Sequence, residues 1–161
     1  MVKFLQAKQT RVFIFITVLI ILLDQLIKFL FIKYQPNWQF WFFNISFVKN
    51  TGAGFGILQD QTLLLGIISL IVVALIVYFY SKVPKQWFPQ VMLALFLGGT
   101  IGNMIDRFFR NYVIDFIGTT FWPSFNLADS MISIAAVGLI IYLIKEEVML
   151  KKLINKKINK K

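Results

Sequence analysis

The chain has 161 residues, of which 58% are hydrophobic, and its mean hydropathy is +0.75. This composition excludes a water-soluble domain and indicates an integral membrane protein. The chain contains no Cys and no His, which excludes disulfides, thiolate nucleophiles, His-based catalytic triads and the common zinc ligand sets. The net charge of +10 comes from basic residues that flank apolar segments, which favours lipid headgroups over nucleic acid as partners.

Four apolar segments are long enough to cross a bilayer as helices, which requires about 20 mostly apolar residues. We expect these spans at Val12–Ile32, Thr62–Tyr80, Pro89–Ile105 and Leu127–Ile144. The first resembles a signal peptide but is longer, contains Asp24 and Lys28 and lacks a small-residue cleavage site, so we expect it to be retained. The sequence therefore predicts a single, mainly helical membrane domain over residues 1–161, built as a four-helix bundle.

The basic residues are distributed unequally between the two sides of these spans. Lys33, Lys49, Arg107 and Arg110 lie on one side. Twelve of the 17 lie on the other: Lys3, Lys8, Arg11, Lys82, Lys85, Lys145, Lys151, Lys152, Lys156, Lys157, Lys160 and Lys161. The positive-inside rule then predicts cytoplasmic termini and outward-facing connections at 33–61 and 106–126. We expect the tail, residues 145–161, to be a flexible cytoplasmic extension attracted to lipid.

The first outer connection is rich in aromatic residues. Aromatic side chains are typical of the headgroup level of a membrane, and this segment holds Tyr34, Trp38, Phe40, Trp41, Phe42, Phe43 and Phe47. Polar and apolar residues alternate over residues 44–48, which predicts a short strand along the membrane. Residues 51–56, with Gly52 and Gly54, supply a flexible turn. A small extracytoplasmic aromatic and β-like segment is therefore expected.

Several polar residues lie inside the predicted spans, where they are costly. Asp24 and Lys28 are four residues apart, which predicts an ion pair that holds the first helix against the bundle, with Lys28 able to snorkel outward. Gly98 and Gly102 form a GxxxG pair that allows close helix approach. Asn103 follows them, and its amide requires a partner at that depth.

Two carboxylates lie among apolar residues at the mouth of the last span. If Asn126 caps that helix, Asp129 occupies its third position, where the helix dipole favours a negative charge. Asp115 has no such support in its apolar surroundings, so desolvation and the nearby Asp129 should raise its pKa. The two groups would then share one proton, as in aspartic proteases. The alternative is that both are only interfacial helix caps.

Five sequence boxes, in order along nearly the whole chain, resemble the lipoprotein signal peptidase, or signal peptidase II, family of bacteria. They are Asp24-x-x-x-Lys28, Lys49-Asn50-Thr51-Gly52-Ala53-Gly54-Phe55-Gly56, Gly98-Gly99-x-x-Gly102-Asn103-x-x-Asp106-Arg107, Val113-x-Asp115-Phe116-Ile117 and Phe125-Asn126-x-Ala128-Asp129-Ser130. One box alone is weak evidence. Five in the family's order, on four spans of the right polarity, are highly specific.

The resemblance implies an aspartyl endopeptidase at the outer face of the bacterial cytoplasmic membrane. Its substrates would be diacylglyceryl-modified prolipoproteins, cut just before the lipidated Cys. The reaction would require no metal or cofactor, and globomycin-type cyclic peptides would inhibit the enzyme. Asp115 and Asp129 align with the catalytic pair. The residues that align with polar or close-packed positions around substrate and inhibitor are Asn50, Gly52, Asn103, Arg107 and Asn126, and those that align with supporting positions are Asp24, Lys28 and Asp106.

Other classes of function remain as alternatives. A small transporter or channel would use Asp24, Lys28 and Asp106 as an ion path, but the acids cluster toward one face and no span is broken at its centre. An assembly subunit would pack through Gly98 and Gly102 and would leave Asp115 and Asp129 unexplained. A Ser–Lys peptidase using Ser130 and Lys28 would leave those two carboxylates without a task.

The predicted orientation is testable by cysteine labelling, because the chain has no Cys of its own. Ile57→Cys is expected to react with a membrane-impermeant maleimide in intact cells, since the basic-residue asymmetry places residues 33–61 outside. Labelling of this variant only after permeabilisation would contradict the orientation.

Overall fold

The structure is a computed structural model that describes residues 2–159, with side chains for residues 8–54 and 56–159. The side chain of Lys3 and the whole of Lys160 and Lys161, which contribute to the predicted orientation, lie outside this part. The helices are α1 (Val2–Tyr34), α2 (Thr62–Phe79), α3 (Trp87–Arg110) and α4 (Leu127–Ile158). The strands are β1 (Asn37–Phe40), β2 (Phe43–Asn50) and β3 (Val113–Thr119), and two short 3-10 helices are η1 (Gly54–Gly56) and η2 (Tyr80–Lys82).

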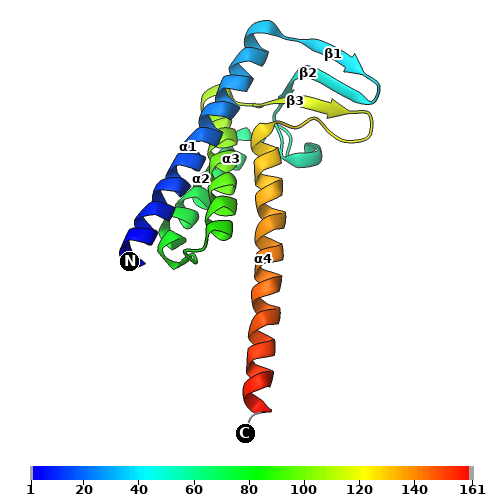
Figure 1. Cartoon of the computed structure of the whole chain (residues 1–161). Coiled ribbons are helices and arrows are strands. Elements are labelled where there is room, and N and C mark those ends of the chain that lie inside the picture. Colours follow the sequence, from blue (N-terminus) through cyan, green and yellow to red (C-terminus); the bar gives the residue numbers. More distant parts are fainter. Residues whose placement is uncertain (1, 160–161) are drawn as a thin grey trace.

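Each of the four helices is long and apolar enough to cross a membrane, and together they cover the predicted spans (Figure 1). The predicted fold class, a mainly helical four-helix membrane bundle with a small β segment, is confirmed. Helices α1, α3 and α4 extend past the predicted bounds because helical hydrogen bonding continues where the apolar pattern stops. α3 ends at Arg110, followed by Asn111 with a left-handed φ of 62°, a common way for a helix to stop.

α3 lies at the centre of the bundle and packs against α1, α2 and α4. Its glycines make this possible. A Cβ atom on Gly98 would lie 3.0 Å from the carbonyl oxygen of Thr17 on α1, and one on Gly99 would lie 2.5 Å from that of Ala128 on α4. The close helix approach predicted from Gly98 and Gly102 is therefore confirmed, and it extends to a second face through Gly99.

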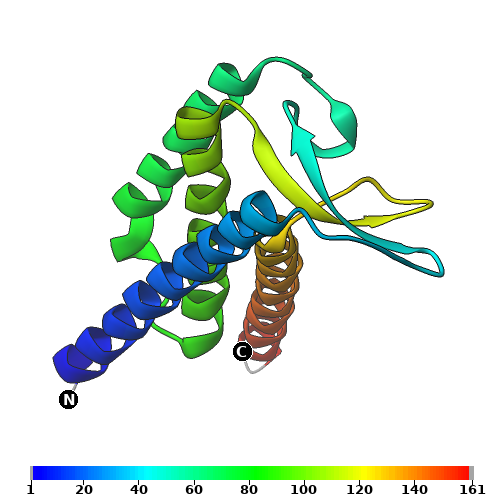
Figure 2. The same cartoon turned by 90° about the horizontal axis from the view of Figure 1, so that it is seen from above.

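The three strands form an antiparallel sheet in the order β1-β2-β3, at the end of the bundle opposite the two termini (Figure 1). Seen from above, the sheet projects to one side of the bundle (Figure 2). The strand predicted at residues 44–48 is confirmed as part of β2. The edge strand β3 packs against the helical bundle and begins with four buried residues. Its Phe116 stacks on Phe31 of α1, with 4.6 Å between the ring centroids. Most aromatic residues of the β1–β2 hairpin, such as Trp41, are exposed, whereas Phe47 is half-buried.

The sequence prediction for the tail differs from the structure. Residues 145–158 continue α4 as a helix instead of forming a flexible extension. The reason is local, because this stretch contains neither Gly nor Pro and is rich in Lys, Leu and Glu, which are good helix formers. Glu147 and Lys151, one turn apart, form an exposed ion pair at 2.7 Å that adds modest support.

Candidate active site

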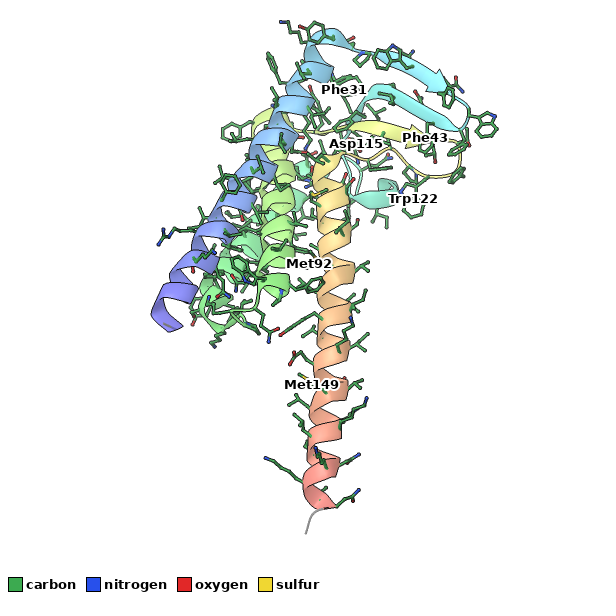
Figure 3. The ribbon with its side chains drawn as sticks, viewed as in Figure 1. Phe31, Phe43, Met92, Asp115, Trp122 and Met149 are labelled. Atoms are coloured by element: carbon green, nitrogen blue, oxygen red, sulfur yellow. The ribbon has the colours of Figure 1, made fainter. Side chains whose placement is uncertain are left out.

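The structure brings the predicted site residues together where the sheet meets the helix ends opposite the two termini of the chain (Figure 3, near Asp115). They come from five elements: Asp24 and Lys28 from α1, Asn50 from the end of β2, Asn103, Asp106 and Arg107 from α3, Asp115 from β3, and Asn126 and Asp129 from the start of α4. Segments far apart in sequence therefore contribute to one cluster.

Asn126 and Asp129 form a reciprocal capping box at the start of α4. Asn126 Oδ1 accepts a hydrogen bond from the Asp129 backbone N–H at 2.9 Å, and Asp129 Oδ2 accepts one from the Asn126 backbone N–H at 3.1 Å. These bonds satisfy N–H groups that lack partners within the helix. The prediction that Asn126 is the cap and Asp129 the third helical residue is confirmed.

Asp115 is held by two side-chain amides. Register between β2 and β3 places Asp115 opposite Val48, two residues before Asn50. Asn50 Nδ2 donates to Asp115 Oδ2 at 2.9 Å, and Asn126 Nδ2 donates to Asp115 Oδ1 at 2.8 Å. Asp115 is in a strand and has no helix-dipole support of the kind that Asp129 has, but strand pairing and the helix cap supply amide partners that its apolar sequence neighbours do not reveal.

The electrostatic state of Asp115 follows from its position. Burial raises the pKa of Asp115 to about 7, and the charge of Asp129 also raises it. The amide hydrogen bonds from Asn50 and Asn126 oppose this rise without cancelling it. The shift agrees in direction with the sequence prediction. At neutral pH the Asp115 carboxyl group is therefore available as a proton donor for a substantial part of the time.

Asn103 connects the two carboxylates to a buried charge. Its Nδ2 donates to Asp129 Oδ1 at 2.7 Å, and its Oδ1 accepts hydrogen bonds from Asn126 Nδ2 at 3.1 Å and from Lys28 Nζ at 2.9 Å. The prediction that this amide requires a partner is confirmed, and both of its polar atoms are engaged. Asn126 is likewise fully used, since its amide contacts Asp129, Asn103 and Asp115.

Lys28 lies between two carboxylates beneath the site. Its Nζ is 2.8 Å from Asp24 Oδ2 and 2.9 Å from Asp106 Oδ2, and all three side chains are fully buried. The predicted Asp24–Lys28 pair is confirmed, whereas outward snorkelling of Lys28 is not observed, because Asp106 and Asn103 supply partners inside the bundle. Within residues 2–159 no three His, Cys, Asp or Glu side chains are grouped to hold a metal ion.

Asp106 connects α3 to β3 and to α1. Its Oδ2 accepts a hydrogen bond from the Ile114 backbone N–H at 3.1 Å, which fixes the start of β3, and its Oδ1 pairs with Arg110. Gln25, which the sequence did not single out, donates to Asp106 Oδ1 at 3.1 Å and accepts from Arg110 at 2.8 Å. Its only sequence signal is a polar amide beside Asp24 in an otherwise apolar span.

A cavity of about 430 Å³ opens beside Asp129. Arg107 is in its wall, and the buried Arg107 Nε has no hydrogen-bond partner among the residues that the structure describes. The rest of the cavity wall is mostly apolar and runs along α4 from Ser130 to Ile134. The side chain of Ile134 is exposed on the outside of the bundle. A ligand with both an apolar part and a hydrogen-bond acceptor suits this cavity.

A second cavity, of about 390 Å³, lies on the other side of the pair and has Asp115 in its wall. Its wall includes residues of the segment 48–59, and Asn50 lines both cavities. This segment is held in a tight turn, in which Gly52 N–H donates to Asn50 Oδ1 at 2.9 Å. Gly52 has no space for a side chain, since a Cβ would lie 2.8 Å from the Ile57 carbonyl oxygen.

Comparison with known proteins identifies the family. The sequence profile described as Signal peptidase (SPase) II matches residues 16–145. The chain belongs to the signal peptidase II family. Membership makes it a membrane-embedded bacterial peptidase, in agreement with its four long apolar helices.

Relatives resemble the chain over most of its length. A lipoprotein signal peptidase of Caldanaerobacter subterraneus subsp. tengcongensis is 40% identical over 130 residues, covering 77% of this chain and 90% of the relative. One of Bacillus pumilus is 40% identical over 139 residues, covering 80% and 90%. The solved structure of a bacterial membrane enzyme at 2.3 Å resolution superimposes with a TM-score of 0.79 and 33% identity, covering 84% of this chain and 89% of the other.

Lys28→Met is expected to lower the yield of folded protein, because it removes the ammonium group between two buried carboxylates. Removing one partner of a buried ion pair typically costs about 3–5 kcal/mol. Adding Asp24→Asn and Asp106→Asn should restore part of the yield, since neutral amides need no counter-charge. The measurements are monodisperse yield and Tm in detergent.

Lys33→Met, the same substitution at an exposed position at the end of α1, serves as the control and should leave both values nearly unchanged. A triple variant that folds no better than Lys28→Met would contradict the pairing.

Proposed function

We propose that the chain is an aspartic endopeptidase that removes signal peptides from diacylglyceryl-modified prolipoproteins, cutting just before the lipidated Cys at the outer face of the cytoplasmic membrane. The observation that carries this proposal is the contact of one amide, Asn126, with both carboxylate residues, Asp115 and Asp129. Family membership supports the substrate class. Two carboxyl groups that share one proton can act as the base and the acid in peptide hydrolysis by activated water.

The two carboxyl groups lie in different surroundings. Asp129 accepts hydrogen bonds from the Asn126 backbone N–H and from Asn103 at the start of α4. Asp115 has a pKa raised to about 7 by burial. We therefore assign Asp129 as the base and Asp115 as the acid, with one proton shared by the pair.

In the proposed reaction, Asp129 takes a proton from a water molecule whose oxygen attacks the scissile carbonyl carbon. Asp115 donates its proton to the carbonyl oxygen as the new C–O bond forms. Collapse of the tetrahedral intermediate breaks the C–N bond: one of its two hydroxyl groups returns a proton to Asp115 as the product carboxyl group forms, and the leaving amine takes the proton held by Asp129. No covalent enzyme intermediate is required, and the pair returns to its starting state with one shared proton.

The cavity beside Asp129 suits an amphipathic substrate. Its apolar wall along α4 would accommodate the apolar end of the signal peptide or an acyl chain that enters from the bilayer. The buried Arg107 Nε would donate to a carbonyl oxygen of the substrate. Asn103 and Asn126, whose polar atoms already bind other groups of the protein, would orient the carboxylates and not bind substrate directly. Asn50 borders both cavities and would contact substrate after the turn at Gly52 moves.

The contacts of Asp24, Lys28 and Asp106 argue against the transporter alternative. Ion conduction requires groups that exchange partners with water or with the transported ion. Here the three charges are fully buried and bind one another, and Asp24 Oδ1 also accepts a hydrogen bond from the Ala128 backbone N–H at 3.0 Å. These contacts suit a fixed support for the site.

Asp115→Asn and Asp129→Asn should each reduce cleavage of a diacylglyceryl lipobox peptide by at least about 100-fold, the typical range for loss of acid–base catalysis. Asn keeps the size of the side chain but neither gives nor takes a proton at these pH values. The double variant should be hardly slower than either single variant, because the pair acts as a unit. The assay is product formation by purified protein in micelles, with globomycin binding as a check of the fold.

Asp60→Asn provides the matched control, because it is the same chemical change at an exposed residue of the outer segment. It should leave the rate unchanged. Near-normal cleavage by either Asp115→Asn or Asp129→Asn would refute the two-carboxylate mechanism.

The rate should also fall as pH rises through about 7, because the proposed acid Asp115 then loses its proton. This alkaline limb reports the pair as a whole. The measurement is kcat/KM of the wild-type protein and of Asp60→Asn across pH values on both sides of 7. A rate that stays level well above neutral pH would be inconsistent with Asp115 as the acid.

A further inference from the structure

The last part of α4 extends beyond the rest of the bundle (Figure 1). The ring of Tyr142 lies 6.3 Å from that of Phe88, which is in the first turn of α3. Residues after Lys145 therefore lie past the level at which α3 begins. Figure 3 shows Met149 on this part of α4, away from the other elements. We call residues 147–158 the α4 extension.

The α4 extension is amphipathic. Met149, Leu150, Leu153 and Ile154 share one face by helical spacing, and each is just over half exposed. The opposite face carries Lys151, Lys152 and Asn155, and Lys156 lies at the border of the apolar face, two turns after Met149. The apolar face continues the side of α4 on which Ala135 and Gly138 are buried, although within residues 2–159 no other helix reaches this far to cover it.

The charge of this region favours an anionic partner. Residues 145–161 contain seven Lys and two Glu. A second copy of the helix against the apolar face would bring two sets of Lys together, which like-charge repulsion opposes. The anionic headgroups of a membrane have the complementary charge, and the acyl boundary below them accepts apolar side chains. Lys157, on the apolar side at the last turn, has a stem long enough to reach the headgroups.

We propose that the α4 extension lies along the membrane surface next to the two termini, inserts its apolar face into the headgroup boundary and binds anionic phospholipid. This requires a bend in α4 where it leaves the bundle, near Lys145–Val148. The proposal is independent of the peptidase activity.

The test uses single cysteines in the full chain, which has none of its own. Leu153→Cys on the apolar face and Asn155→Cys on the polar face are each labelled with an environment-sensitive fluorophore. The proteins are placed in nanodiscs of phosphatidylcholine alone or of phosphatidylcholine with phosphatidylglycerol. The probe at 153 should shift to shorter wavelength and be quenched by spin-labelled lipid only in the anionic discs, and high salt should reverse the shift. The probe at 155 should report water in both.

A charge-neutralised variant separates binding to anionic lipid from burial against protein. Lys151→Gln, Lys152→Gln and Lys156→Gln combined should abolish the shift of the 153 probe in anionic discs. A 153 probe that reports water in both lipids, or shifts equally in both, would overturn the proposal. A shift that appears in discs with two copies but not in discs with one would instead assign the apolar face to a second copy and would also overturn it.

Discussion

The arrangement of the site depends on one buried ammonium group, Lys28. Fully desolvated charges are tolerated only when paired and hydrogen-bonded. Lys28 meets this condition through Asp24 on its own helix, Asp106 on α3 and the Asn103 oxygen. Arg110 pairs with the other oxygen of Asp106 and supplies the second positive charge of the cluster. The ends of α1 and α3 next to the sheet are therefore fixed relative to each other by electrostatics as well as by glycine packing.

Hydrogen bonds from this buried cluster also fix the positions of Asp115 and Asp129. Asn103 receives the Lys28 contact on its oxygen and must then present its NH₂ group to Asp129. Asp106 accepts the backbone N–H of Ile114, the residue directly before Asp115, and so fixes the start of β3. Each carboxyl group is therefore positioned by backbone or amide contacts that trace back to the same buried cluster.

The sequence predicts the helices, the pair Asp24–Lys28 and the capping role of Asn126, because each depends on residues within a few turns of one helix. It also predicts the need of Asn103 for a partner but not which partner. The amide donors of Asp115 could not be deduced, since Asn50 reaches it through strand register and Asn126 through folding of the β3–α4 connection. The helical tail was missed because its lysines were judged by charge and not by helix propensity.

The bond from the Ala128 backbone to Asp24 joins the last helix of the chain to the first. This contact has a consequence for biosynthesis. Asp129 leaves the ribosome after α1, α2, α3 and β3, so the site stays incomplete until the fourth helix has entered the bilayer and docked. A nascent chain with three inserted helices has Asp115 but lacks Asn126 and Asp129. On the proposed mechanism, hydrolysis therefore begins only after the fourth helix has docked.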